Sequence, residues 1–373
     1  MAIYTALGAG DPAPWFTQRS LANPAYAFHT SAGRYLVLCY FGSAADPHSQ
    51  AALAAVRRRG DIFNDDFASF FGVSLDPADE SEKRIADSYP GYRFFLDHDG
   101  SIGRAYGTVP KDETVTPGLL NRSWFVLDPT MRLVEVIPFA DDRSDIASLI
   151  ECMDRLPPPQ EFAGFEVHAP ILVLPRVFDP DFCRELIGLY EQDGGAESGF
   201  MRDQDGKTVR LTDHSHKRRR DFQILDAALI KRVQKFVVRR IFPEILKVHQ
   251  YRVTRMERYL VGCYAAEDGG HFGAHRDNTT AATAHRRFAV SINLNDDFEG
   301  GEVGFPEYGP RRYKAPAGGA VVFSCSLLHS VSRVTSGRRY AFLPFLYDDA
   351  AAAIREANNK FLSADVQQYN SNG

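Results

Sequence analysis

The sequence predicts two domains, an α/β domain followed by a mainly β domain with supporting helices. Three observations carry this prediction. The chain has 373 residues, 44% of them hydrophobic, which is enough to bury two cores. Three consecutive prolines at 157–159 interrupt it. Strand-like and helix-like segments alternate before the prolines, whereas helix-like segments precede a group of strands after them.

Residues 1–156 alternate apolar strand-like runs with helix-compatible stretches. The runs are RYLVLCYFG, FASFFGVSLD, YRFFLD and SWFVLDP, and the helix-compatible stretches are SQAALAAVRRRGDIF and ESEKRIADSY. This alternation indicates a sheet with crossover helices. An amphipathic stretch, SDIASLIECMDRL, closes the domain. We place a proline-rich linker at 157–164, because consecutive prolines continue neither a helix nor a central strand.

The second domain, residues 165–373, begins with helical spacing and ends in short strands. DPDFCRELIGLYEQ and DAALIKRVQKFVVRRIFPEILKVH have the apolar spacing of helices. Gly and Pro then separate the strand-like runs FAVSINLN, GGEVGFPEY, GGAVVFSCS and RRYAFLPFLYD. This order predicts a sandwich or a barrel supported by helices.

Composition argues against several classes of protein. The first twenty residues lack the pattern of a secretory signal, and no run reaches membrane-spanning length, so we expect a cytoplasmic protein without a membrane partner. The five cysteines are scattered singly, unlike a zinc site or a disulfide framework. The basic run HSHKRRRDF lacks interleaved aromatic residues in a chain of net charge −5. We interpret it as a loop at a substrate entrance and not as a nucleic-acid site.

The densest group of chemically capable residues begins at His275. His275 and Asp277 are separated by one residue, so in an extended segment both side chains project to the same side, as two ligands of one metal require. His329 ends a strand-like run and could complete a face of two histidines and one carboxylate. Such a face leaves three positions open on a ferrous ion, for a chelating co-substrate and dioxygen.

Arg339 supplies a second kind of chemistry. It lies ten residues beyond His329, on the next strand-like run. A planar guanidinium grips a carboxylate through two parallel hydrogen bonds. A metal face combined with a carboxylate clamp suggests a dicarboxylate co-substrate.

The combined motif resembles the Fe(II)/2-oxoglutarate-dependent dioxygenases of the prolyl 4-hydroxylase-like branch. The motif begins with HRD at residues 275–277. A second histidine, His329, follows 54 residues after His275, and Arg339 follows ten residues later; SINLNDDFEGGEVGFP and GGAVVFS lie between the two histidines. The resemblance covers roughly residues 165–348. It implies a double-stranded β-helix, or jelly roll, in which His275, Asp277 and His329 bind Fe(II). Arg339 would then pair with the distal carboxylate of 2-oxoglutarate, and RYLVGCY would supply an inward tyrosine, either Tyr259 or Tyr264.

This resemblance also implies a reaction. With O2, 2-oxoglutarate would be converted to succinate and carbon dioxide while an unactivated C–H bond is hydroxylated, with ascorbate as a reductant of the iron. The substrate would be a small molecule or a peptide. The protein would hold the metal open, place the substrate and exclude side reactions.

Polar residues near the triad form a further group of candidates. His271 and His285 could donate hydrogen bonds to a metal ligand or to the substrate. A basic rim could help to hold 2-oxoglutarate or an anionic substrate, and it comprises Arg276, Asn278, Arg286 and Arg287. For all six residues the alternative is a solvated loop. The polar, arginine-rich character of the region favours a polar or anionic substrate.

Residues 1–156 resemble a peroxiredoxin of the thioredoxin-fold superfamily. GDPAPWFTQRS, YLVLCYFGSAADPHSQ, FGVSLD, RFFLDHDGSIGRAYG and NRSWFVLDPTMRLVEV follow the order of that family. Its catalytic loop carries Thr or Ser, a peroxidatic cysteine three residues later, and a distant arginine that lowers the pKa of the thiol. Asp46, Ser49 and Arg122 stand at these positions here. A serine hydroxyl is no usable nucleophile toward peroxide, so we expect no peroxidase activity.

Three functions follow, in order of preference. The first is the hydroxylase. The second is a non-catalytic sensor or scaffold that binds iron and 2-oxoglutarate. The third is a thiol peroxidase acting through Cys39, although the apolar run YLVLCYFG around it indicates a buried, inert thiol. The resemblance also implies that the N-terminal domain serves homodimerisation, or presents a substrate or partner to the iron site.

Overall fold

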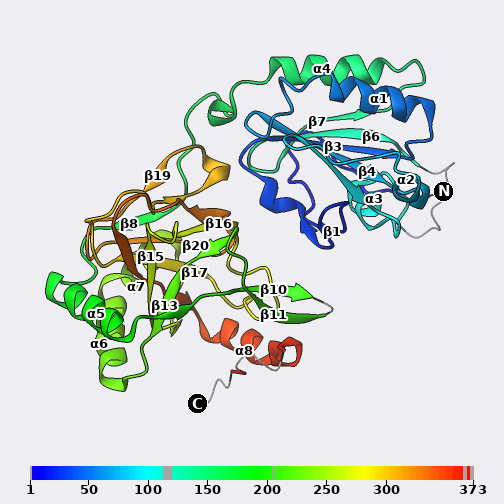
Figure 1. Cartoon of the computed structure of the whole chain (residues 1–373). Coiled ribbons are helices and arrows are strands. Elements are labelled where there is room, and N and C mark those ends of the chain that lie inside the picture. Colours follow the sequence, from blue (N-terminus) through cyan, green and yellow to red (C-terminus); the bar gives the residue numbers. More distant parts are fainter. Residues whose placement is uncertain (1, 112–119, 205, 364–367, 370–373) are drawn as a thin grey trace. The chain divides into compact units, whose positions relative to one another are not determined.

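The computed structural model describes residues 2–111, 120–204, 206–363 and 368–369 (Figure 1). The chain divides into two compact units. The N-terminal unit comprises Met1–His168 with Pro306–Pro310, and the C-terminal unit comprises Ala169–Phe305 with Arg311–Gly373. None of the helices in the described residues combines the length and the apolar character that crossing a membrane would take.

A five-stranded mixed sheet organises the N-terminal unit, with the strand order β5-β4-β3-β6-β7. Strand β4 pairs in parallel with both β3 and β5, whereas β6 pairs antiparallel with β3 and β7. The elements of this unit are β1 (Thr17–Gln18), β2 (Tyr26–Ala27), η1 (Phe28–Ser31), β3 (Tyr35–Gly42), α1 (Pro47–Arg57), β4 (Ala68–Ser74), α2 (Pro77–Ser81), β5 (Tyr92–Leu96), α3 (Ser101–Tyr106), β6 (Ser123–Leu127), β7 (Leu133–Pro138), α4 (Ser144–Arg155), η3 (Pro159–Glu161) and η4 (Pro306–Tyr308).

The sheet is buried on both faces. All eight residues of β3 are buried, as a continuous apolar run in a covered sheet predicts. Alternate residues of β3 pack with Val56 of α1 and Leu149 of α4, which cover one face. An aromatic cluster on another part of the unit links Phe71 of β4, Phe95 of β5 and Phe28 of η1. This layered arrangement is thioredoxin-like and confirms the predicted α/β domain.

One helical expectation in this unit is wrong in extent. The stretch ESEKRIADSY is helix-compatible, but α2 ends at Ser81 and Lys83 adopts a φ of 55°. The Asp79 carboxylate accepts hydrogen bonds from the Ala44 backbone and the Ser74 hydroxyl, which holds this short helix against the ends of β3 and β4.

Two large sheets and the two-stranded sheet β10-β11 build the described part of the C-terminal unit. A nine-stranded sheet follows the path β14-β23-β17-β22-β15-β13-β9, with β20 joining β17 to β8, and a five-stranded sheet has the order β12-β16-β21-β18-β19. The strands are β8 (Leu172–Leu174), β9 (Ala196–Glu197), β10 (Phe200–Gln204), β11 (Lys207–Leu211), β12 (Lys217–Arg218), β13 (Arg220–Gln223), β14 (Arg255–Glu257), β15 (Leu260–Ala265), β16 (His271–His275), β17 (Phe288–Asn293), β18 (Val303–Gly304), β19 (Arg312–Tyr313), β20 (Ala320–Ser324), β21 (His329–Val331), β22 (Arg338–Phe342) and β23 (Phe345–Tyr347).

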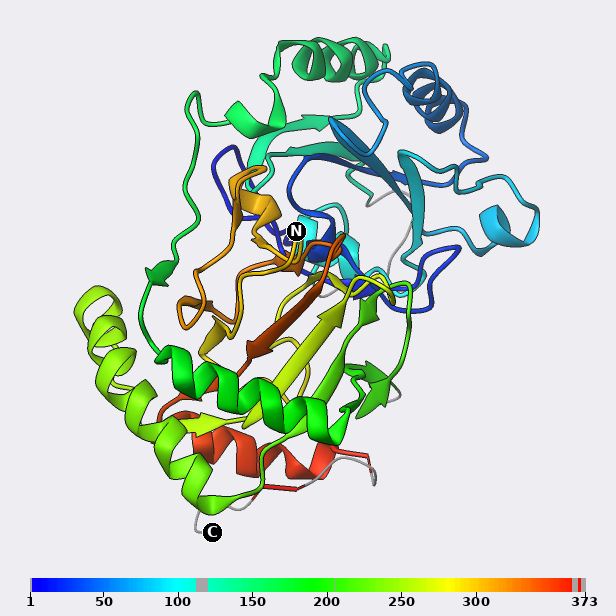
Figure 2. The ribbon, with the colours of Figure 1, turned by 60° about the vertical axis from the view of Figure 1, so that its left-hand side comes forward.

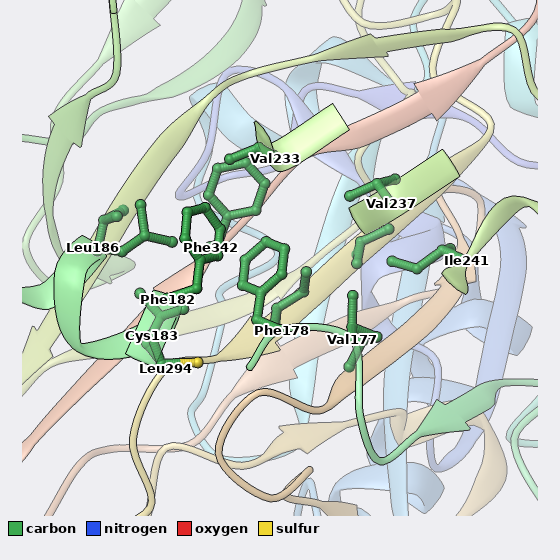
Figure 3. Close-up of a cluster of buried hydrophobic side chains, with 14 of the residues drawn as sticks. Val177, Phe178, Phe182, Cys183, Leu186, Val233, Val237, Ile241, Leu294 and Phe342 are labelled. Carbon is green, nitrogen blue, oxygen red and sulfur yellow. The ribbon is translucent and has the colours of Figure 1, made fainter. Parts of the chain in front are cut away.

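Helices support the larger sheet on one side (Figure 2). The helices on this side are α5 (Pro180–Asp193), α6 (Ala227–Arg240) and α7 (Phe242–His249). Helix α8 (Asp349–Ala357) packs in a separate cluster with Tyr347 of β23, and η5 (Asn358–Phe361) follows it. Figure 3 shows side chains of α5 and α6 meeting Phe342 of β22 in one buried cluster. The predicted long helical stretch 226–249 is divided at Ile241, because Pro243 cannot continue α6. Two open sheets with helical support confirm the jelly-roll prediction and favour a sandwich over a barrel.

Candidate metal centre and its pocket

Antiparallel pairing of β16 with β21 brings the two predicted histidine ligands together. His275 is the last residue of β16 and lies opposite His329, the first residue of β21. The register shifts between Phe272 and His275, a local irregularity of the kind that redirects a side chain. The two imidazole centroids are 4.2 Å apart as a result.

Asp277 completes the cluster from the turn after β16. Its backbone N–H donates to the carbonyl oxygen of Cys325 at 2.9 Å, which fixes the turn against the segment that precedes β21. The carboxylate oxygens lie 3.5 Å from Nε2 of His275 and 3.3 Å from Nε2 of His329. One candidate ligand atom from each of the three residues lies within 4.8 Å of the others.

Backbone carbonyls orient both imidazoles. Nδ1 of His275 lies 2.8 Å from the carbonyl oxygen of Gly273, and Nδ1 of His329 lies 3.0 Å from that of Leu327. A carbonyl can only accept, so each Nδ1 carries the proton and each Nε2 presents its lone pair toward Asp277. Two neutral imidazole nitrogens and one carboxylate form the donor set typical of non-haem Fe(II) sites.

The protonation states also suit a metal. Burial disfavours the charged form of the Asp277 carboxyl, but His329 and His275 outweigh burial and hold its pKa below the usual range. Burial, together with repulsion from His275, lowers the pKa of His329 to about 4. At neutral pH the carboxylate is therefore charged and His329 is neutral, which are the forms that bind a cation.

A pocket lined by residues of both sheets contains all three candidate ligands. Phe272 stacks on His275 with centroids 3.6 Å apart, and Phe323 packs edge-on against His329 at 4.6 Å. The other lining residues are Arg219, Arg258, Tyr264, Ala289, Val290, Ser291, Val303, Val331, Arg339, Leu343, Pro344 and Phe345. The pocket therefore combines an apolar wall with three guanidinium groups.

Arg339 projects from β22 and is almost fully buried, with 2% of its surface exposed. Its Nε donates to Oδ1 of Asn293 at 2.9 Å, and its Nη2 donates to the hydroxyl of Ser291 at 2.6 Å. Nη1 has no hydrogen-bond partner in the described part of the chain. Burial and the nearby Arg219 charge lower the pKa of Arg339, although Tyr264 counteracts them. A buried cation with an open donor is suited to an anionic ligand.

The two candidate tyrosines lie in different environments. Tyr264 lines the pocket, and its hydroxyl accepts a hydrogen bond from Nη1 of Arg219 at 3.2 Å. Tyr259 packs instead against the helix-covered core, where its hydroxyl accepts from Gln234 at 2.7 Å. Of the two, only Tyr264 is placed to contact a molecule in the pocket.

The predicted neighbours of the triad make contacts outside the pocket lining. Both ring nitrogens of His271 face backbone carbonyls, of Gly269 and Ser215. His285 is buried beside Glu257, with Nε2 3.1 Å from a carboxylate oxygen. The remaining four bond to nearby groups: Arg276 to the carbonyl of Ser326, Asn278 to the hydroxyl of Ser326, Arg286 to Glu257, and Arg287 to the carbonyl of Ala284.

Sequence reasoning missed four polar residues: Ser291, Arg219 and Arg258 line the pocket, and Asn293 binds the side chain of Arg339. Ser291 and Asn293 occupy alternate positions of the apolar strand β17, and this period-2 polar pattern could have indicated a polar pocket face. Arg219 belongs to the basic run HSHKRRRDF, which we placed at an entrance. Arg258 follows β14 without any local signal, because its position in the pocket depends on the pairing of β14 and β15 with other strands.

The N-terminal unit brings its three predicted residues into mutual contact. Asp46 caps α1 by accepting from the backbone N–H groups of His48 and Ser49, at 3.0 and 2.9 Å. Arg122 donates to the same carboxylate. The Ser49 hydroxyl is fully buried and donates to the carbonyl of Phe41 at 3.1 Å. The charged groups are thus satisfied by one another.

Cys39, the candidate thiol of this unit, lies in an environment that disfavours reaction. Cys39 is fully buried, and burial together with the Asp145 charge raises the pKa of its thiol. The other four cysteines are also buried and free. A buried thiol with a raised pKa supplies little thiolate for reaction with peroxide.

Comparisons with known proteins match each half of the chain to a separate family. Residues 256–347 match the model of the 2OG-Fe(II) oxygenase superfamily, and residues 9–136 match that of the AhpC/TSA family. A PKHD-type hydroxylase of Synechococcus sp. (strain JA-2-3B'a(2-13)) is 30% identical over 115 residues, which are 29% of this chain and 49% of that protein. The chain thus spans about half the length of this relative.

Two further relatives extend the comparison. A PKHD-type hydroxylase of Pseudomonas putida (strain W619) is 26% identical over 220 residues, which cover 53% of this chain and 91% of the relative. The solved structure of a prolyl hydroxylase from Trichoplax adhaerens, in complex with a peptide fragment of hypoxia inducible factor, covers 56% of this chain and 94% of its own at 14% identity and a TM-score of 0.40. With both family models matched, the chain carries a 2OG-Fe(II) oxygenase superfamily domain toward its C-terminal end and an AhpC/TSA family domain toward its N-terminal end.

Proposed function

We propose that the protein is an Fe(II)- and 2-oxoglutarate-dependent dioxygenase that hydroxylates an unactivated C–H bond of a small-molecule or peptidyl substrate. One observation carries the proposal. The His275, Asp277 and His329 donor set lines the same pocket as the buried guanidinium of Arg339, whose Nη1 is open. A metal-binding face next to an unsatisfied cation fits a metal-chelating dicarboxylate.

The candidate ligands and several residues around them have defined tasks in this proposal. His275, Asp277 and His329 hold Fe(II), and Arg339 pairs with the distal carboxylate of 2-oxoglutarate while Ser291 and Asn293 keep its side chain in place. Tyr264 orients the same carboxylate from the facing strand β15. The apolar wall of the pocket excludes water from the metal site; it is formed by Phe272, Phe323, Val303 and Val331. When bound, Fe(II) and 2-oxoglutarate supply the oxidising chemistry, consuming O2 and releasing succinate and carbon dioxide.

The proposal extends to reductant, location and assembly by family resemblance. Ascorbate would keep the iron reduced, and the protein would work in the cytoplasm. The N-terminal unit, whose candidate residues bond to one another, would serve as a homodimerisation or substrate-presentation module and not as a peroxidase. Membrane and nucleic-acid partners are not part of the proposal.

Anaerobic titration tests the cofactor site without knowledge of the substrate. The metal-free protein receives Fe(II) and then 2-oxoglutarate, and the visible metal-to-ligand charge-transfer band is recorded. We expect a band in the parent, its loss in Asp277→Ala, and a weakened band in Arg339→Ala. Asp268→Ala and Arg338→Ala, which change exposed neighbours, serve as matched controls and should keep the band.

The result separates the proposal from its rivals. A folded parent protein that gives no band would refute the oxygenase assignment. A band without succinate formation, across a panel of candidate substrates under O2, would instead favour a sensor that binds iron and 2-oxoglutarate without turnover. Removal of the metal with a chelator should abolish both the band and succinate release, because both need the occupied triad.

A further inference from the structure

Two of the three guanidinium groups in the pocket are left unexplained by the proposed cofactor. Arg339 is assigned to 2-oxoglutarate, whereas Arg219 and Arg258 line the same pocket without a role. Arg258 lies in the connection between β14 and β15, with a φ of 64°. This left-handed conformation is costly for a residue with a long side chain and persists only where the surrounding structure enforces it.

The Arg258 side chain lines the pocket and is also partly exposed to solvent, with 28% of its surface accessible. Its guanidinium carbon lies 5.4 Å from the centroid of the Phe345 ring, another lining residue. Its ion pair in the described part of the chain is a single contact, from Nη2 to Oδ2 of Asp221 at 3.5 Å. That distance makes the contact weak compared with a paired guanidinium and carboxylate.

The acidic groups near Arg258 are already engaged by other residues. Asp221 accepts from Nε and Nη2 of Arg219 at 2.6 and 2.8 Å. Glu257, the preceding residue in the chain, contacts three other side chains, those of His285, Arg286 and Arg355. Burial and the Arg219 charge lower the pKa of Arg258 to about 10, against the attraction of Asp221. The positive charge of Arg258 is therefore poorly compensated.

A charge balance of the loaded pocket leaves one positive charge. Fe(II) and the two carboxylates of 2-oxoglutarate cancel. The lining holds three arginines and the carboxylate of Asp277, and Asp221, which lies just outside the lining, pairs with Arg219, so one positive charge remains. A cation next to an apolar wall in a partly buried pocket attracts an anion.

We propose that Arg258, with Arg219 beside it, binds a carboxylate of the substrate, so that the molecule oxidised is a carboxylic acid with an apolar carbon skeleton. This inference rests on the proposed function. One residual charge matches a monoanionic carboxylate better than a phosphate dianion, and a guanidinium presents two parallel donors to a carboxylate. The skeleton would lie against Ala289, Leu343, Pro344 and Phe345, which line the pocket near the arginines.

Paramagnetic relaxation tests the inference on the full chain. The protein is loaded with Mn(II) and 2-oxoglutarate, and isobutyrate is added while the relaxation of its methyl protons is measured. We expect a strong enhancement from the bound metal and none with isobutyramide, the neutral isostere. Inorganic phosphate, followed by phosphorus relaxation, should bind more weakly than isobutyrate. A dipeptide with a free C-terminus, compared with its amide, tells whether the carboxylate can belong to a peptide.

Variants assign the effect to Arg258. Arg258→Gln should weaken isobutyrate binding at least about tenfold, because a charge-assisted pair is lost. The affinity of Arg258→Lys for isobutyrate should lie between those of the parent and Arg258→Gln, since lysine keeps the charge but lacks the two parallel N–H donors. If Arg258→Gln does not fold, Arg258→Lys serves as the test variant. Arg255→Gln changes a half-buried arginine that pairs with Asp349 outside the pocket, so it should match the parent.

The outcomes distinguish this inference from the proposed function. An enhancement that persists in both Arg258 variants would mean direct binding of isobutyrate to the metal and would overturn the assignment. A parent that binds Mn(II) and 2-oxoglutarate but shows no enhancement would overturn the inference alone. A parent that binds neither would instead refute the proposed function, as the loss of the charge-transfer band would.

Discussion

Each unit carries a polar cluster at the site that its sequence motif predicts. The two clusters differ in how many of their hydrogen-bonding groups find a partner within the protein. In the N-terminal unit, Asp46 accepts from two backbone N–H groups and from Arg122, and the Ser49 hydroxyl is bonded inside the fold. In the C-terminal unit, Nη1 of the buried Arg339 has no partner among the described residues, and the imidazoles present free lone pairs. The first cluster is complete without a ligand, and the second is not.

The N-terminal cluster therefore has the character of a structural network, and the C-terminal cluster that of a ligand-binding site. Buried polar groups cost free energy unless they are paired, so an unpaired cation is retained where a ligand repays the cost. Asp46 also supplies in the N-terminal unit the negative charge that would otherwise come from an anion beside Arg122. The N-terminal unit thus keeps a thioredoxin-like fold around a self-satisfied polar cluster, whereas the C-terminal pocket holds a candidate donor set and an open guanidinium nitrogen.

The largest expected effect concerns Arg339. We expect Arg339→Gln to raise the dissociation constant of 2-oxoglutarate about 100-fold, because a buried charge-assisted pair is lost. The free energy of unfolding should not fall comparably, because the variant also removes an uncompensated buried charge. Isothermal titration with Mn(II)-loaded protein and urea unfolding measure the two quantities. Arg338→Gln on the same strand is the control, and an equal loss of affinity there would contradict the assignment.

Acid should weaken the N-terminal unit through Asp65. Burial acts to raise the pKa of this carboxyl, but bonds from Arg93 and Ser69 outweigh it and lower the pKa to about 2. Because the folded pKa is depressed, the stabilisation is present at neutral pH and is lost as pH falls below about 4 and through 2; it amounts to about 2 kcal/mol.

Urea unfolding of Asp65→Asn tests this dependence. The variant should be about 2 kcal/mol less stable than the parent at pH 7, and the deficit should shrink as the pH approaches 2. Asp66→Asn changes the adjacent exposed carboxyl and should show neither effect. A deficit that is constant with pH would point to packing and not to the ion pair.

Placing the peroxiredoxin residues at positions 46 and 49 should free Arg122 to lower the pKa of a thiol at position 49. In Ser49→Cys alone, Asp46 still neutralises Arg122, so the new thiol keeps a high pKa. Adding Asp46→Thr releases the arginine, and we expect peroxide consumption to rise about tenfold over the single variant. The ultraviolet absorbance of the thiolate against pH reports the pKa. Equal pKa values in the single and double variants would show that Asp46 does not control this cluster.

The smallest effect concerns the helix cap. Asp46→Ala removes the acceptor for two N–H groups of α1 and the partner of Arg122, so it should cost about 1 kcal/mol of unfolding free energy. Thermal unfolding followed by circular dichroism measures the change, with the exposed Asp141→Ala as control. A stabilised variant would mean that the cluster stores strain and is not structurally complete.

The sequence predicted the elements whose signals are local. Continuous apolar runs predicted the buried strands of the N-terminal sheet, and the stretch beginning SQAALAAVRR predicted a helix that the structure has as α1. The HRD motif with a later histidine and arginine predicted the candidate ligands, since one ordered pattern joins four residues. His275 and His329 do lie opposite each other in paired strands. Over ESEKRIADSY, by contrast, α2 ends at Ser81, and Lys83 adopts a φ of 55° that the local sequence did not predict.

Other features depended on tertiary structure alone. Tyr259 and Tyr264 both fit the motif, but strand pairing places only Tyr264 in the pocket. The arginines after His275 were expected to lie at a ligand pocket, whereas Arg258, without a local signal, lines it and they do not. Residue identity determined by itself which chemistry the chain could supply. Which groups remain unpaired was decided only by folding, because pairing depends on partners brought together from distant parts of the chain.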